Sequence, residues 1–193
     1  MKPTALIIAA LLLTQLPLPS ATALSIQPTS EIAQSSQTAA DYIKQGDTKS
    51  ESGDKPGAVQ DYTSALNLEP ENVEAYISRG TAKSELGDKP GAIQDYDRAI
   101  VLSPKIAEFY HLRGITKDEA GDKLGAMTDY DVAIDLQPEL ALAYVSRGIA
   151  KYESGDKQAA IQDMTKAAEL FKQQGKMDFY QRSIDFIKQV QDT

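Results

Sequence analysis

The sequence contains no cysteine and no tryptophan, and its single histidine is His111. The absence of cysteine excludes disulfides, thiolate metal sites, iron–sulfur clusters and cysteine nucleophiles. One histidine leaves no second imidazole for a metal site or a proton relay. Since no nucleophile–base pair, metal cluster or cofactor loop can be assembled from the remaining side chains, we predict that the protein is not an enzyme and uses no cofactor.

Positive charge is also scarce. The chain has 20 lysine and arginine residues against 28 aspartate and glutamate residues, a net charge of −8, and its pI is near 4.7. Binding to a phosphate backbone needs clustered basic residues, so nucleic acid is excluded as a partner. With 41% apolar and 25% charged residues among 193, the chain has the balance of a soluble globular protein with one sizeable core.

A long apolar run lies at the start of the chain. Lys2 precedes nine apolar residues at 5–13, and the segment ends in the small residues 21–23. This layout is typical of a secretory signal peptide. We therefore predict that residues 1–23 direct export to a periplasmic, lumenal or extracellular compartment. The alternative is an uncleaved membrane anchor, although the run is shorter than the roughly 20 apolar residues of a spanning helix.

The segment after this predicted cleavage site has a different composition. Residues 24–38 are rich in serine, glutamine and threonine and carry no periodic apolar face. Such a segment cannot bury enough apolar surface to fold, so we predict a flexible linker.

From residue 39 onward the sequence repeats every 34 residues without insertion. The four units span residues 39–72, 73–106, 107–140 and 141–174. Each unit has a tyrosine at its fourth place and a glycine at its eighth, namely Tyr42, Tyr76, Tyr110, Tyr144, Gly46, Gly80, Gly114 and Gly148. Later places hold two alanines and a second large residue: Ala58, Ala92, Ala126, Ala160, Tyr62, Tyr96, Tyr130, Met164, Ala65, Ala99, Ala133 and Ala167. The first three units close on Pro70, Pro104 and Pro138.

This pattern resembles the tetratricopeptide repeat family, whose unit has the same residue types in the same order. The resemblance covers residues 39–174 and implies an all-α fold, a right-handed superhelical solenoid of four helix hairpins. The apolar spacing agrees with it, because each unit has two stretches of helical periodicity around a turn. The glycines and alanines are small where helices approach closely, and the tyrosines fill the space beside them.

The chain after the fourth unit also has helical spacing. Met177, Tyr180, Ile184 and Ile187 recur at intervals of three or four residues. We predict that residues 175–193 form the terminal capping helix that a solenoid requires. Its further apolar residues, such as Phe179 and Phe186, leave open a second contact surface.

The turn of each unit carries the sequence Gly-Asp-Lys. A glycine followed by lysine can belong to a phosphate-binding loop, but there the lysine is followed by serine or threonine. Here it is followed by proline, leucine or glutamine. We therefore predict a turn, in which glycine ends the first helix and aspartate caps the second.

Charged residues also recur in register. Basic residues occupy the seventh and eleventh places, where the family more often has leucine and tyrosine: Arg79, Arg113, Arg147, Lys49, Lys83, Lys117 and Lys151. The second predicted helices carry Asp61, Asp95, Asp129 and Asp163. We predict ion pairs across each hairpin, and a basic stripe for an anionic ligand is the alternative. Glutamates at the thirteenth place, Glu51, Glu85, Glu119 and Glu153, indicate a solvated edge rather than a catalytic carboxylate pair.

The resemblance also implies where a partner would bind. In this family the first helix of each unit lines the inner face, through its second, fifth, ninth and twelfth places. Carried over by position, our candidates for a peptide-binding groove are Ile43, Asp47, Glu74, Ile77, Thr81, Glu108, His111, Ile115, Asp118, Val145, Ile149 and Tyr152. His111 in this set is either an ordinary contact or a group that reports pH near neutrality.

The predicted groove has apolar residues flanked by acidic ones, which suits a peptide with apolar anchors and basic residues. The family's clamp for acidic chaperone tails has no counterpart at these places. We therefore expect a scaffold or adaptor for protein–protein interaction. The family resemblance implies a role in assembling or stabilising envelope complexes. The alternative is a self-association module, in which the groove or the capping helix meets a second copy of the chain.

Overall fold

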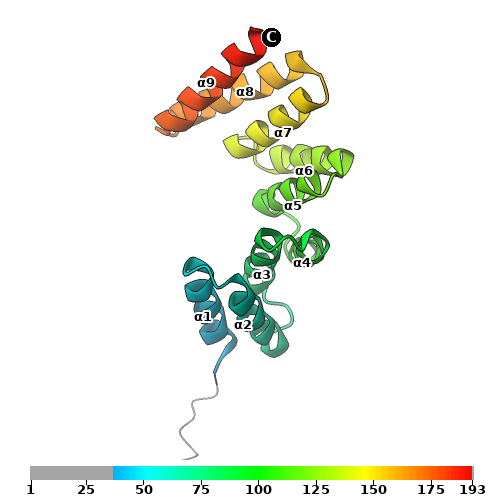
Figure 1. Ribbon diagram of the computed structural model, residues 1–193, viewed down its shortest axis with the longest axis vertical. Helices are drawn as coiled ribbons and strands as arrows, with labels where there is room; N and C mark the ends of the chain where they lie inside the picture. The colour runs from blue at the N-terminus through cyan, green and yellow to red at the C-terminus, as the bar shows by residue number, and fades with distance from the viewer. Residues whose placement is uncertain (1–36, 193) are drawn as a thin grey trace, which may run out of the picture. The chain divides into compact units, whose positions relative to one another are not determined.

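The computed structural model describes residues 37–192, and every regular element in this range is a helix (Figure 1). The helices are α1 (Ala39–Glu51), α2 (Lys55–Leu68), α3 (Val73–Glu85), α4 (Lys89–Leu102), α5 (Ala107–Glu119), α6 (Lys123–Leu136), α7 (Ala141–Glu153), α8 (Lys157–Gln173) and α9 (Met177–Gln191). The predicted signal peptide and nearly all of the predicted linker lie outside the described residues.

The helices pack as consecutive hairpins. α1 packs on α2, α3 on α4, α5 on α6 and α7 on α8, and α9 packs on α8. Each second helix also contacts the first helix of the next hairpin, which joins the four hairpins into one stack. The predicted all-α solenoid of four hairpins and a terminal helix is confirmed.

The first helices form the inner face of this stack. α1 contacts α3, α3 contacts α5, and α5 contacts α7, whereas within residues 37–192 the second helices make no comparable contacts with one another. A stack curves toward the side on which neighbouring helices lie closer together. The inner face is therefore built from α1, α3, α5 and α7.

The Gly-Asp-Lys segments are turns between the paired helices. Gly87 has a φ of 86°, in the left-handed region that glycine adopts without strain. Asp88 then caps α4, because its carboxylate accepts a hydrogen bond of 3.0 Å from the backbone N–H of Gly91. The other three turns have the same left-handed glycine and the same aspartate cap. The predicted turn is confirmed.

Each of the first three hairpins closes on a contact between a glycine and a tyrosine. A Cβ added to Gly114 would lie 2.6 Å from Cε1 of Tyr130, and one added to Gly80 would lie 2.9 Å from Cε1 of Tyr96. Both tyrosines are 1% exposed. Only a residue without a side chain allows this approach, so the predicted packing of small residues against tyrosine is confirmed.

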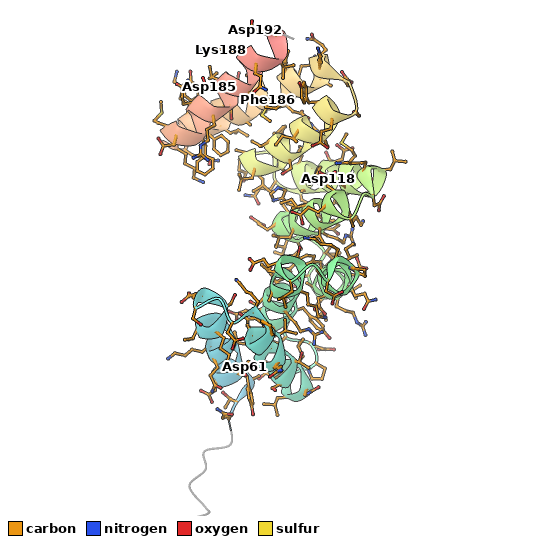
Figure 2. The ribbon with its side chains drawn as sticks, in the orientation of Figure 1. Asp61, Asp118, Asp185, Phe186, Lys188 and Asp192 are labelled. Atoms are coloured by element: carbon orange, nitrogen blue, oxygen red, sulfur yellow. The ribbon has the colours of Figure 1, made fainter. Side chains whose placement is uncertain are left out.

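Helix α9 covers the last hairpin. Phe179 stacks on Phe171 of α8 with ring centroids 5.1 Å apart. Phe186, labelled on α9 in Figure 2, meets Tyr152 of α7 edge-on at 5.5 Å. Met177 and Phe179 are nevertheless 53% and 44% exposed, so α9 also presents apolar surface.

We expect Gly114→Ala to destabilise the protein. The new methyl group would collide with the buried ring of Tyr130, which is held by neighbouring helices. The free energy of unfolding should fall by about 1–3 kcal/mol, although alanine is the better helix former. Urea denaturation followed by circular dichroism measures the change.

Gly148→Ala is the matched control. The fourth unit has Met164 in place of the tyrosine, and the new Cβ would lie 3.5 Å from Met164 Cγ and 3.2 Å from Asp163 Cβ. The loss should therefore be smaller than for Gly114→Ala. Equal losses of unfolding free energy in the two variants would show that the collision with the tyrosine ring is not the cause of the destabilisation.

Candidate functional site

The candidate groove residues lie on the first helices, but they are not equally accessible. Glu74, Glu108 and Ile149 are exposed. The half-buried members are Asp47, Ile77, Thr81, Ile115, Asp118, Val145 and Tyr152. Ile43 and His111 are only 6% and 8% exposed. These two side chains therefore belong to the packing between helices and offer little surface to a partner.

His111 connects the third and fourth hairpins. Its Nε2 lies 2.9 Å from Oγ of Ser146 on α7, and its ring lies 6.0 Å from that of Tyr130. Burial lowers its pKa, although a backbone contact with Leu142 and the charge of Glu108 oppose this. The imidazole is therefore mainly neutral at neutral pH, as an ordinary packing contact would be.

The inner face is hollowed between α1 and α3. This hollow, which we call the N-terminal hollow, has a volume of about 320 Å³. Its lining residues are Asp47, Ser50, Glu51, Tyr62, Ile77, Ser78 and Thr81. The structure thus brings three of the sequence-predicted groove residues, Asp47, Ile77 and Thr81, to the wall of one cavity. Tyr62, from α2, is a lining residue that the first-helix positions do not include.

A buried tyrosine holds one carboxylate of this hollow. The hydroxyl of Tyr62 donates a hydrogen bond of 2.8 Å to Oδ1 of Asp47, and the tyrosine is 2% exposed. Burial and the bond to Asp47 raise the pKa of Tyr62 far above its ordinary value. The hydroxyl therefore stays protonated and keeps Asp47 in place as an acceptor.

The N-terminal hollow has the chemistry of a recognition site. Its walls offer two carboxylates, four hydroxyls and the apolar side chain of Ile77. Within residues 37–192, no three histidine, aspartate or glutamate side chains gather as metal ligands. The arrangement is suited to hold a polar or cationic group beside an apolar one.

The recurring arginines are bound to aspartates. Arg113 donates to Asp129 through Nε and Nη2 at 2.8 and 2.6 Å, and Lys117 adds an ion pair of 2.9 Å to the same carboxylate. Asp129 is 2% exposed. Arg79 and Arg147 bind the aspartates of their own hairpins in the same way. The predicted ion pairs are confirmed, and these arginines are not a stripe awaiting an anionic ligand.

Two of these arginines also reach back to the preceding hairpin. Nη1 of Arg113 donates to Asp97 of α4 at 2.6 Å, and Nη1 of Arg147 donates to Asp131 of α6 at 2.7 Å. These contacts were not predicted from the sequence. The recurrence of Asp97 and Asp131 at the same place of two units was the available signal.

The turn lysines join hairpins at the solvated edge. Lys55 pairs with Glu85 at 2.5 Å, and Lys123 pairs with Glu153 at 2.6 Å. Lys89 pairs with Glu119 in the same way. In each pair the glutamate belongs to the next unit. The sequence pattern predicted that these glutamates lie at a solvated edge, but it did not predict that they form ion pairs between units.

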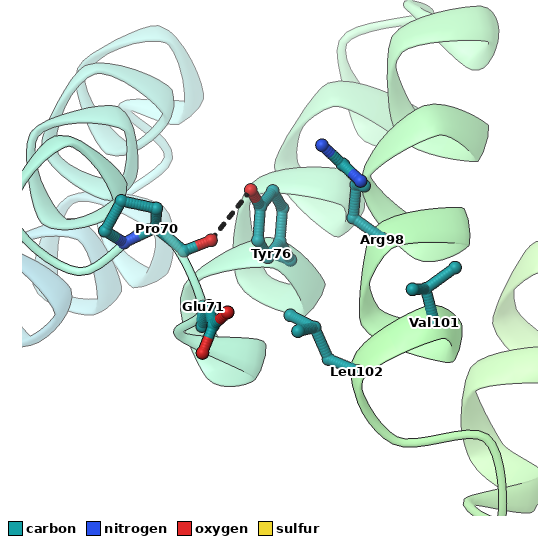
Figure 3. A pocket seen from close by; sticks show the side chains of 6 residues that line it. All are labelled: Pro70, Glu71, Tyr76, Arg98, Val101 and Leu102. Atoms are coloured by element: carbon teal, nitrogen blue, oxygen red, sulfur yellow. Dashed lines mark hydrogen bonds between the residues drawn. The ribbon is translucent and has the colours of Figure 1, made fainter.

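A second hollow lies away from the inner-face residues. It measures about 250 Å³, and its lining residues are Pro70, Glu71, Tyr76, Arg98, Val101 and Leu102 (Figure 3). The Tyr76 hydroxyl donates to the Pro70 carbonyl at 3.1 Å, while Arg98 and Val101 come from α4. Val101 is 70% exposed. No sequence pattern pointed to this hollow, because Arg98 and Val101 are particular to the second unit.

The stacked hairpins and their inner face define an α-helical solenoid. Residues 43–105 match the sequence model of the tetratricopeptide repeat. The first two hairpins therefore match the tetratricopeptide repeat, and the later hairpins repeat the same packing. Proteins of this family are typically non-catalytic interaction modules. No curated protein sequence matches the chain.

Solved structures show the same fold. A crystal structure of MamA has 23% identity and a TM-score of 0.63 over 80% of this chain and 90% of that one. MamA from Desulfovibrio magneticus RS-1 has 22% identity and a TM-score of 0.66 over 70% and 77%. The first repeat domain of Spaghetti (RPAP3), bound to the HSP90 peptide SRMEEVD, has 22% identity and a TM-score of 0.59 over 62% and 95%. Identities this low establish the fold alone.

We expect Asp163→Asn to lower stability and to flatten its dependence on acid. Burial alone would raise the pKa of Asp163, but hydrogen bonds from Arg147 and Lys151 lower it below the ordinary value. The carboxylate therefore stabilises the fold above its unfolded pKa of about 3.9. This contribution is lost as pH falls through the lower folded pKa.

The variant should lose about 1.5–3 kcal/mol at neutral pH, because the half-buried Arg147 and Lys151 would then donate to a neutral side chain. Its free energy of unfolding should then fall less between neutral and acid pH than that of the wild type. Urea denaturation at a series of pH values measures both effects. Asp135→Asn, at an exposed position of α6, is the control. An unchanged acid dependence in Asp163→Asn would contradict the assignment.

Proposed function

We propose that the protein is a non-catalytic scaffold that binds a segment of a partner protein along the inner face of α1, α3, α5 and α7. The observation that carries this proposal is the N-terminal hollow, which opens between two first helices where the family places its groove. The ninth place of the inner face, which contributes Asp47 and Thr81 to the hollow, varies between units, whereas the packing residues recur. A surface shaped for one partner has this pattern.

The chemistry of the inner face indicates the kind of partner. Ile77, Ile115 and Val145 are half-buried, and Ile149 is 38% exposed, so they can accept apolar anchors of a bound segment. Exposed carboxylates, among them Glu74, flank these residues and favour basic residues in the partner. The HSP90 peptide bound to RPAP3 is acidic at its end, whereas the exposed carboxylates of this inner face favour a basic partner.

We further propose that the protein works outside the cytoplasm, where it contributes to the assembly of an envelope complex. The support is the sequence pattern of residues 1–23, which includes a basic start, an apolar run and small residues before the predicted cleavage point. No helix within residues 37–192 is long and apolar enough to cross a membrane. An attachment to the membrane would therefore come from a segment outside that range, such as an uncleaved signal.

The second candidate function is self-association, and one observation favours it. Met177 and Phe179 of α9 are about half exposed although both are large and apolar. Burial of such side chains against a second copy of the chain would remove apolar surface from water.

We expect Ile77→Glu combined with Ile149→Glu to weaken the binding of peptides selected on the wild-type chain. The two glutamates would place charge at apolar anchor positions of the inner face and repel an apolar segment. Affinity should fall at least about tenfold, as measured by fluorescence anisotropy of the labelled peptides.

Leu124→Glu is the control for this experiment. Leu124 is 84% exposed at the start of α6, outside the inner face, so its substitution should leave affinity unchanged. Circular dichroism establishes that all variants are folded, and light scattering over a range of concentrations detects self-association. If the double variant binds the peptides with wild-type affinity, the proposed binding along the inner face is wrong.

We expect the exported protein to begin at Leu24. Mass spectrometry of the purified mature chain measures its first residue. Ala23→Arg should block processing, because the cleavage site needs small residues. Efficient removal of the segment from this variant, or a cytoplasmic chain that keeps Met1, would contradict the proposed export.

A further inference from the structure

We propose that the N-terminal hollow is a subsite for one lysine or arginine side chain of the bound partner segment. This inference rests on the proposed function, since it specifies one contact within the inner-face groove. We expect the hollow to hold a cationic side chain with an apolar stem, rather than an acidic or a purely apolar side chain.

The hollow combines an aspartate that is particular to the first unit with a glutamate that recurs in every unit. Asp47 stands at the ninth place, where the other units have Thr81, Ile115 and Ile149. Glu51 belongs to the recurring glutamates, but no unit precedes it within residues 37–192 to supply a turn lysine. Its side chain instead lines the hollow. The site therefore depends on being at the beginning of the stack.

The cations near the hollow are already bound to other groups. Lys49 pairs with Asp61 at 2.7 Å. Lys55, at the rim, pairs with Glu85 and donates to Oγ of Ser50 at 2.9 Å. Within the described residues, no ion pair joins a lysine or arginine of the chain to Asp47 or Glu51. A cation from a partner would therefore meet carboxylates that the fold has not neutralised.

The walls match the shape and polarity of a long basic side chain. Lysine and arginine carry an apolar stem and a charged head, and the stem packs against apolar surface. Ile77 provides that surface, while the hydroxyls of Ser78 and Thr81 line the same wall. Asp47 is already oriented by the buried Tyr62 hydroxyl, so little ordering is needed when the cation arrives.

The molecule binds lysine with the same kinds of groups elsewhere. Lys123 lies between Asp118 at 2.7 Å and Glu153 at 2.6 Å. Lys89 donates to Oγ of Ser84 at 3.2 Å and pairs with Glu119. A carboxylate with a neighbouring hydroxyl or second carboxylate is thus a lysine acceptor that this fold builds repeatedly. The N-terminal hollow presents such a set on the inner face, open to a partner.

The test begins with a library of random 12-residue peptides displayed on phage and selected on the full chain. The selected peptides are synthesised with a fluorescent label, and each basic residue is replaced in turn by norleucine or by glutamate. Norleucine keeps the apolar stem of lysine and removes the charge. Anisotropy then gives the affinity of each peptide for the wild type and for Asp47→Asn combined with Glu51→Gln.

This double variant removes both charges with little change in shape. Asparagine still offers an oxygen to the Tyr62 hydroxyl, so the contact that positions residue 47 is kept. Asp135→Asn combined with Glu169→Gln is the matched control, because it removes two exposed carboxylates from second helices, outside the inner face.

We expect one basic residue to recur in the selected peptides. Its replacement by norleucine should weaken binding to the wild type about tenfold, as for loss of a charge-assisted hydrogen bond. The glutamate peptide should bind more weakly still. Neither replacement should matter in Asp47→Asn with Glu51→Gln, and salt raised from about 0.05 M to about 0.5 M should shrink the wild-type difference.

Three results would overturn the subsite. The first is a set of selected peptides without a basic residue, and the second is equal affinity of the lysine and norleucine peptides for the wild type. The third is an equal loss in the Asp135→Asn and Glu169→Gln control. In each case peptides still bind the inner face, so the proposed function stands. If no displayed peptide binds the chain, or if Ile77→Glu with Ile149→Glu leaves binding unchanged, the proposed function and the subsite both fail.

Discussion

The close approach of the two helices in each hairpin is the constraint on which the rest of the structure depends. In the first three hairpins a glycine in the first helix leaves room for a buried tyrosine ring from the second, and in the third hairpin the ring would lie 2.6 Å from any added Cβ. Because protein interiors are close-packed, this fit sets both the distance and the rotation of one helix against the other. The inner-face side chains take their directions from that rotation.

Ion pairs then fix each hairpin against its neighbour. Arg113 binds Asp129 within its own hairpin and Asp97 in the preceding one. Buried pairs of this kind add little net stability, but a shifted register would leave charges buried without partners. Most of the regularly spaced cations are therefore used within the stack. At its N-terminal end the fold leaves Asp47 and Glu51 lining the hollow, where we propose that a cationic side chain of a partner binds.

Much of this architecture could be predicted because it recurs every 34 residues. The turns, the glycine–tyrosine contacts and the arginine–aspartate pairs appear in several units, and a pattern that recurs in register indicates a shared structural role. The candidate groove was predicted less completely. Ile43 and His111 occupy groove places by family position, yet both are buried. Tyr62 lines the hollow from a second helix, which position within the first helix does not reveal.

The sequence by itself determined the repeat, the helix hairpins and the residues that pack them, since local spacing and repetition are written along the chain. Only the tertiary structure decided which groove residues are accessible and which carboxylates remain available. Accessibility depends on side chains from neighbouring hairpins, as when Ser146 of α7 meets His111 of α5 at 2.9 Å. The availability of a charge depends on whether a cation from another unit reaches it. Both properties arise between segments far apart in the sequence.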